Sequence, residues 1–173
     1  MIAREEFAAR IVRVRGRMAE AGLDALACYG AHVDYAPGDL RYLADWFCIE
    51  EEQAMLVIPA DGSVALLTDS AADLDRAREQ AVCDEVEHAP EIGAAVAARL
   101  RGLELVGLTG GRVLPAAAMD ALRGGVRAVT DASALTTELR MVKSPAELAL
   151  LAEVAAVVAD ELLRAQQRGV LAR

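Results

Sequence analysis

Three aspartates in the stretch TDSAADLD form the densest group of side chains that could bind a cation. Asp69, Asp73 and Asp75 lie close together in the sequence, and a hard cation needs several converging oxygen ligands. The same residues also suit a helix start, with Asp69 or Ser70 as N-cap and acidic side chains in the first turns. The spacing favours the helix start, and the cation site is the alternative.

Other patterns that could support chemistry are incomplete. The stretch GLTGGRVLP is expected between a strand and a helix, but it lacks the spacing of both common phosphate loops, so we expect a plain turn. His32 and His88 are the only histidines, and neither belongs to a metal-binding pair. Cys28 is expected in a buried strand and Cys48 in a more exposed position, where no histidine nearby in sequence could activate the thiol. No catalytic constellation is visible in the sequence.

An aromatic and acidic stretch is the remaining candidate for a binding surface. Trp46 and Phe47 stand just before the run Glu50, Glu51 and Glu52. Exposed aromatic rings beside carboxylates suit a protein interface or a cationic ligand. The alternative is a solvated edge with no partner.

Composition restricts the class of protein. The net charge of −9 argues against nucleic acid as a partner, because phosphate binding needs clustered Lys and Arg. No apolar run approaches the length of a membrane span, and the N-terminus has no apolar signal core. The three cysteines are widely spaced and are expected to be reduced thiols. We therefore expect a cytoplasmic protein with no membrane partner.

Helical and strand patterns alternate along the chain. Apolar residues three or four apart predict a helix over 3–21, and QAMLVIPADGSVALLT predicts a hairpin that turns at residues 60–62. Further strands are predicted in LDALACYG, VCDEVEHA, LELVGL and VRAVTDA, and further helices at 70–80, 91–101, 115–122 and 133–142. This order predicts an α/β fold, a mixed sheet of about six strands with helices on both faces.

A long amphipathic helix is predicted at the C-terminal end. Ser144 has capping-box spacing to Glu147, and Pro145 suits the first helical turn. An apolar stripe then follows at Leu148, Leu151, Ala155, Val158 and Leu162. We expect this stripe to pack against a neighbour that the sequence does not contain; the alternatives are its own sheet or a second copy of the chain.

Several motifs, in the right order, resemble a known family. The run ELRMVKSPAELALLAEVAAVVAD, anchored by Arg140, Lys143, Ser144 and Glu147, is similar to the domain junction of creatinase/prolidase-type proteins, which include Xaa-Pro dipeptidases and Xaa-Pro aminopeptidases. RMAEAGLDALACYG resembles the opening of their N-terminal domain, and the hairpin also matches. DLRYLADW stands where the family often has N-x-x-Y-L-T-G, with Asp in place of Asn and of Gly.

The resemblance implies a division of the chain and of its function. Residues 1–143 would be the N-terminal domain, and 144–173 a linker helix leading into a catalytic domain that this sequence lacks. The family's hydrolases hold two divalent metal ions (Mn, Co or Zn) with Asp, Asp, His, Glu and Glu of that catalytic domain, and creatinase works without metal. No position here matches those ligands, so we expect no cofactor and no catalysis in this chain alone.

The resemblance also implies a supporting role for the domain. It would mediate contacts in a homodimer and wall the active-site cleft, with Trp46, Phe47, Glu50 and Glu51 as substrate-facing rim candidates. Tyr42 is expected to pack on its own turn, and an acidic rim would favour cationic substrates. The expected partners are thus the catalytic domain and a second copy of the chain. The alternative function is that of a stand-alone module, which either dimerises or binds a small molecule at the carboxyl ends of its strands.

Overall fold

The structure is a computed structural model that describes residues 2–31, 38–49 and 52–168. It divides into two compact units, one formed by Arg4–Arg140 and the other by Met1–Ala3 with Met141–Arg173.

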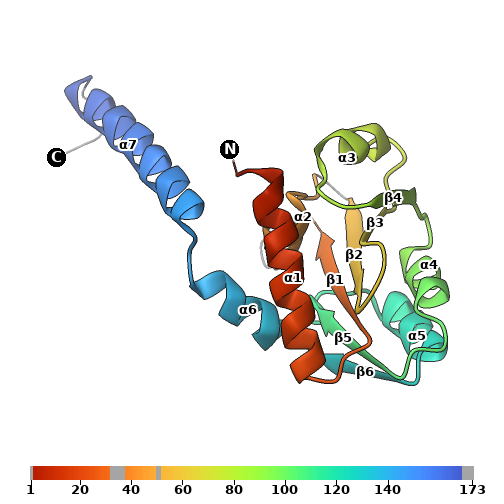
Figure 1. Cartoon of the computed structure of the whole chain (residues 1–173). Coiled ribbons are helices and arrows are strands. Elements are labelled where there is room, and N and C mark those ends of the chain that lie inside the picture. Colours follow the sequence, from red (N-terminus) through yellow and green to blue (C-terminus); the bar gives the residue numbers. More distant parts are fainter. Residues whose placement is uncertain (1, 32–37, 50–51, 169–173) are drawn as a thin grey trace. The chain divides into compact units, whose positions relative to one another are not determined.

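A six-stranded sheet forms the centre of the first unit, with the strand order β4-β3-β2-β1-β5-β6 (Figure 1). The strands are β1 (Ala25–Ala31), β2 (Gln53–Pro59), β3 (Ala65–Thr68), β4 (Glu85–His88), β5 (Leu105–Thr109) and β6 (Ala128–Asp131). The hairpin β2–β3 and the pair β1–β2 are antiparallel, whereas β1–β5, β3–β4 and β5–β6 are parallel. The predicted mixed sheet is confirmed.

Helices cover both faces of this sheet. They are α1 (Arg4–Glu20), α2 (Asp39–Ala44), α3 (Leu74–Gln80), α4 (Ile92–Arg99), α5 (Ala116–Gly125) and α6 (Ser133–Met141). One core cluster joins α1, α2 and α6 to β1 through Leu26 and Cys28, and a second joins α4 and α5 to the other face through Ala27 and Tyr29. Because successive strand residues point to opposite faces, β1, in which every residue except the last is buried, supplies both cores.

Local sequence explains where α1 and the hairpin begin and end. The predicted stripe of α1 is buried through Phe7, Val14 and Met18, and Gly22 follows the helix with a φ of +67°. Gly62 turns the hairpin with a φ of +96°, a conformation that is costly for residues with a Cβ atom. Both predictions are confirmed.

The helix predicted over 70–80 begins later than expected. Ser70 and Asp73 form a turn instead, in which the Ser70 hydroxyl donates to the Asp73 carboxylate at 2.8 Å and accepts from the Asp73 N–H at 3.2 Å. Helix α3 therefore starts at Leu74, with Asp73 as its N-cap residue. Ser and Asp side chains compete with helix formation through such local hydrogen bonds.

Helices α4 and α5 pack very closely on one face of the sheet (Figure 1). A Cβ atom on Gly93 would lie 2.5 Å from the Cα of Ala118 and 2.7 Å from its Cβ. Only a glycine allows the two backbones to approach this closely at this point, and Gly125 of α5 is needed in the same way opposite Ala97 of α4.

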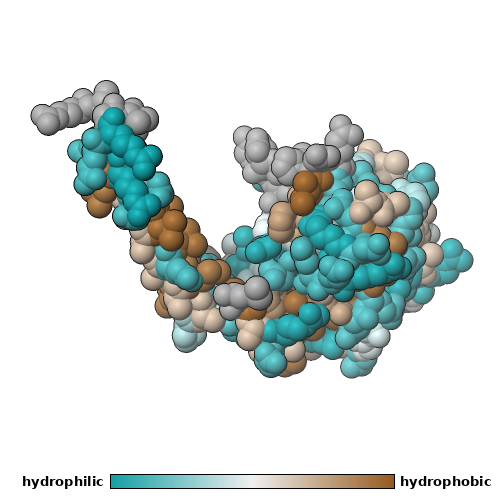
Figure 2. Space-filling model, turned by 90° about the horizontal axis from the view of Figure 1, so that it is seen from above, coloured by the Kyte–Doolittle hydropathy of each residue, from teal (hydrophilic) through white to brown (hydrophobic). Residues whose placement is uncertain are grey.

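The second unit contains the long helix α7 (Pro145–Gln167). The predicted capping box is confirmed: the Ser144 hydroxyl accepts from the Glu147 N–H at 3.1 Å, and the Glu147 carboxylate accepts from the Ser144 N–H at 2.9 Å. None of its residues is buried, and the stripe that includes Leu148, Leu151 and Leu162 is exposed. Figure 2 shows brown apolar patches along this helix.

No helix among the described residues combines the length and the apolar character that a membrane span requires.

Candidate functional site

The segment after α2 contains the predicted rim residues, and the structure separates them. Phe47 is 47% exposed and Ile49 is 41% exposed, but Trp46 is completely buried. The expectation that Trp46 is an exposed aromatic is therefore wrong, and its ring belongs to the core. Glu50 and Glu51 lie outside the described residues.

Arg76 of α3 fixes this segment from the side. Its guanidinium lies 3.9 Å above the centre of the Trp46 ring, a cation–π arrangement, and 5.5 Å from the centre of the Phe47 ring. Its Nη2 forms an ion pair with Glu52 at 3.1 Å, and its Nη1 donates to the Phe47 carbonyl at 3.4 Å. The start and the end of the segment are thus joined through one side chain.

Glu52 is the buried member of the acidic run. Its side chain is 1% exposed and accepts hydrogen bonds from the Thr68 hydroxyl at 2.9 Å and from the Ile49 N–H at 3.1 Å. Burial raises the pKa of Glu52 above its ordinary value, although these bonds and Arg76 act in the opposite direction. For Glu52, the alternative of a solvated edge is wrong.

The three cysteines all have thiols with a raised pKa. Cys48 is more exposed than Cys28, as predicted, but both side chains are buried, and the Cys48 thiol donates to the Gly30 carbonyl at 3.4 Å. Burial and the nearby Glu52 carboxylate raise the pKa of Cys48 to about 12, and burial also raises the pKa of Cys28 and of Cys83. A thiol with a raised pKa stays protonated at neutral pH and reacts slowly.

The junction arginine is bonded to the helix that precedes this segment. Arg140 Nη1 lies 3.0 Å from Oδ1 of the buried Asp39, and the Thr136 hydroxyl donates to Oδ2 at 3.1 Å. Tyr42 is buried as expected, but its hydroxyl donates to the Leu139 carbonyl at 3.3 Å rather than within its own turn. The end of α6 therefore orients α2, and through it the segment that begins at Trp46. The other junction residues, Lys143, Ser144 and Glu147, belong to the second unit.

The aspartates considered for a cation serve local structure instead. Asp69 accepts from the Gln53 N–H at 2.8 Å, Asp73 pairs with Arg76 at 2.9 Å, and Asp75 pairs with Arg78 at 3.3 Å. Across residues 2–31, 38–49 and 52–168, no group of three or more His, Cys, Asp or Glu side chains could hold a metal ion. The described residues therefore do not fit a metal pair.

No pattern in the sequence indicates the role of Arg76. It lies in a helix rich in exposed charges, and apart from the nearby Asp73 its partners belong to a segment that precedes it by more than twenty positions. Asp39 was visible only as a departure from the family pattern, and its carboxylate is what allows the ion pair with Arg140.

Solved structures with the same fold come from peptidases. The chain resembles the N-terminal domain of the cytoplasmic peptidase PepQ from Mycobacterium tuberculosis H37Rv with a TM-score of 0.61 and 23% identity, covering 76% of this chain and 98% of that one. It resembles an Xaa-Pro dipeptidase from Bacillus anthracis (TM-score 0.68, 22% identity) over 91% of this chain and 43% of that one. It also resembles the prolidase from Pyrococcus horikoshii OT3 (TM-score 0.70, 15% identity) over 91% of this chain and 42% of that one.

The chain thus spans less than half the length of the prolidase and of the Xaa-Pro dipeptidase. No curated protein matches the sequence significantly. The family of creatinase/prolidase N-terminal domains matches residues 10–142, which include the whole sheet and the segment held by Arg76. The chain belongs to the creatinase/prolidase N-terminal domain family.

Proposed function

We propose that this chain is the non-catalytic N-terminal domain of a cytoplasmic hydrolase of the creatinase or Xaa-Pro dipeptidase type. The observation that carries the proposal is the family match over residues 10–142. Structures of a prolidase and an Xaa-Pro dipeptidase, of which this chain covers 42% and 43%, support it.

The partner of α7 in this proposal is the catalytic domain of the same hydrolase. Leu151, Val154 and Val158 are each more than half exposed, and a helix with such a stripe is stable when the stripe is covered. The two divalent ions (Mn, Co or Zn) expected for such a hydrolase would belong to that catalytic domain, since the described residues here offer no ligand group.

The contribution of this domain to activity would be the substrate-facing rim and the contacts of a homodimer. Phe47 and Ile49 are exposed apolar side chains, and Arg76 contacts the carbonyl and the ring of Phe47, so Arg76 would position Phe47 toward the substrate. Trp46 is buried and would not touch the substrate; it would instead hold Arg76 in place through the contact between its ring and the guanidinium. The acidic contribution of Glu50 and Glu51 stays a prediction.

An assay of peptide hydrolysis tests whether this domain is non-catalytic by itself. The purified 173-residue chain is expected to show no turnover of Xaa-Pro dipeptides above the buffer rate, with Mn²⁺, Co²⁺ or Zn²⁺ added in turn. Two-metal hydrolysis needs bridging carboxylates, which the described residues do not bring together. Turnover that copurifies with the chain and saturates with substrate would contradict the proposal.

The rim can be tested in a protein that joins this domain to its catalytic domain. Replacing Phe47 with alanine is expected to lower kcat/KM for an Xaa-Pro dipeptide about tenfold, which is the loss of one aromatic contact in the transition state. Val12→Ala is the matched control, because Val12 is an apolar side chain that is 69% exposed on α1 and does not belong to this segment. Equal kcat/KM values for the two variants would show that Phe47 does not contact the substrate and would contradict the rim role.

A further inference from the structure

A pocket on the α5 side of the sheet is not used by the proposed function. It has a volume of about 250 Å³ and lies where β5 and β6 end, against α5. Its lining residues are Leu108, Gly111, Arg112, Met119, Arg123, Val129, Thr130, Asp131 and Ser133. All of them belong to the unit Arg4–Arg140, so the pocket is complete within one unit.

The position of the pocket suits a ligand. Strands β5 and β6 are parallel, and Leu108 is the register partner of Asp131, so their carboxyl ends meet at one edge of the sheet. In open α/β sheets, small molecules bind outside the carboxyl ends of parallel strands. The loop that follows β5 contributes Gly111 and Arg112, and both belong to the stretch GLTGGRVLP.

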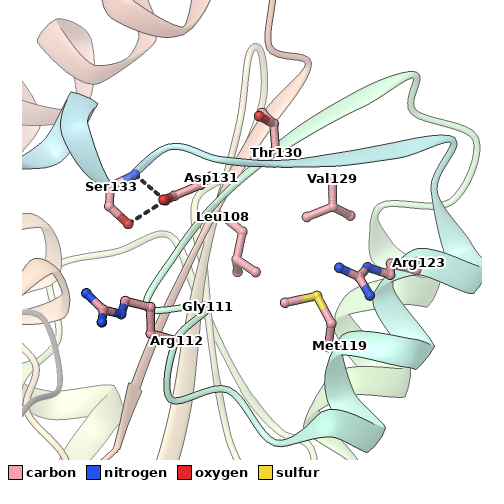
Figure 3. A pocket seen from close by; sticks show the side chains of 9 residues that line it. All are labelled: Leu108, Gly111, Arg112, Met119, Arg123, Val129, Thr130, Asp131 and Ser133. Carbon is pink, nitrogen blue, oxygen red and sulfur yellow. Dashed lines mark hydrogen bonds between the residues drawn. The ribbon is translucent and has the colours of Figure 1, made fainter.

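One part of the pocket has apolar walls and is bordered by the positively charged side chain of Arg123. Figure 3 shows the side chains of Met119, Val129 and Arg123 pointing toward one another, with Leu108 beside them. Among the described residues, no hydrogen bond or ion pair is assigned to the Arg123 guanidinium. A guanidinium of this kind binds a carboxylate through two parallel hydrogen bonds.

In the other part of the pocket, the Asp131 carboxylate already accepts hydrogen bonds from the protein itself. The Asp131 carboxylate accepts from the Ser133 hydroxyl at 2.6 Å and from the Ser133 N–H at 2.9 Å (Figure 3). These bonds, together with the positive charge of Arg112, lower the pKa of Asp131, so this carboxylate is ionised at neutral pH. The free positive charge is therefore at the Arg123 end.

Size and polarity restrict the class of ligand. The volume is equivalent to roughly eight water molecules, which is too small for a nucleotide. Inorganic phosphate would leave the apolar walls unused, and a cation would face two arginines. A small organic anion with an apolar body matches both parts.

We propose that this pocket binds a small monocarboxylate with a short apolar chain. The carboxylate binds the Arg123 guanidinium, and the apolar chain packs on Leu108, Met119 and Val129. This proposal does not depend on the hydrolase assignment, so its failure would leave that assignment intact.

A titration followed by ¹H–¹⁵N NMR tests the proposal on the 173-residue chain. Isovalerate is expected to shift the amide signals of Gly111, Val129 and Asp131 with saturation, at a dissociation constant on the order of 1 mM for a ligand of this size. Isovaleramide has the same shape without the charge and is expected to bind about tenfold more weakly. Valine distinguishes the source of the carboxylate: binding equal to that of isovalerate indicates amino acids, and weaker binding indicates a free carboxylic acid.

Two arginine variants complete the test. Arg123→Gln is expected to weaken isovalerate binding about tenfold, because it removes the charged end of the carboxylate contact. Arg101→Gln removes the same charge from an exposed position outside the pocket and is expected to leave binding unchanged. The NMR spectrum of each variant reports whether it is folded. The proposal is overturned by the absence of saturation up to about 50 mM isovalerate, by equal binding of the amide, or by equal affinity of the folded Arg123→Gln variant.

Discussion

Replacing Gly93 with alanine is expected to lower the free energy of unfolding by about 3 kcal/mol, at the upper end of the usual cost of overpacking. The added methyl group would meet the Ala118 backbone at 2.5 Å, so α4 and α5 have to separate. Both helices cover the same core cluster, and their separation would loosen the contacts of Val96 and Leu122. Urea denaturation monitored by circular dichroism measures the change.

Gly124→Ala is the matched control for this prediction. Gly124 lies in α5, and a Cβ atom there would meet nothing within 4 Å. The substitution should therefore be neutral or stabilise by up to about 1 kcal/mol, as alanine does in a helix. If the two alanine variants unfold at the same urea concentration, close approach of the helices is not what requires glycine at position 93.

Replacing Arg76 with alanine is expected to cost about 3 kcal/mol at pH 7. The change removes the ring contact with Trp46 and leaves the Glu52 carboxylate, which is 1% exposed, without its ion-pair partner. The control on the same helix is Arg78→Ala, whose ion pair with Asp75 is exposed on both sides and should cost less than about 0.5 kcal/mol. Thermal or urea unfolding of the two variants gives the comparison.

The pH dependence of this loss follows from Glu52. Its pKa is raised in the folded protein, so the ionised form destabilises the fold, and this effect grows as the pH rises above the ordinary value of 4.5 through the folded pKa. Without the Arg76 charge, which lowers that pKa, the ionised carboxylate becomes more costly. The difference in unfolding free energy between wild type and Arg76→Ala should therefore be smaller near pH 4.5 than at pH 7. A difference that does not change with pH would show that Glu52 contributes nothing to the loss.

The elements of the fold could be predicted from local patterns. The helix stripe of α1 and the capping box of α7 each depend on residues a few positions apart, which the sequence displays directly. The start of α3 could not, because Ser70 and Asp73 satisfy each other in a turn that competes with helix formation. The same residues, Ser70 and Asp73, can either start a helix or form a turn, and the sequence alone does not distinguish the two.

The candidate site was only partly predictable, because burial depends on distant residues. Trp46 and Phe47 are adjacent, yet Arg76 and the core bury the first, while the second stays half exposed. Cys48 is buried for the same reason, since its thiol reaches the Gly30 carbonyl on β1. The pocket near Arg123 combines two strands, a loop and two helices, and no single stretch of sequence contains its pattern.

The ion pair between Asp39 and Arg140 joins side chains 101 positions apart. During synthesis, α2 leaves the ribosome long before α6, so α2 cannot form the ion pair with Arg140 until α6 has also been released. Strand β1 also pairs late with β5. The Asp24 carboxylate, just before β1, accepts from the Glu104 N–H, just before β5, and these two residues are 80 positions apart. Nascent chains that stop short of Arg140 should thus keep the region near Trp46 open to chaperones and proteases until translation has passed the end of α6.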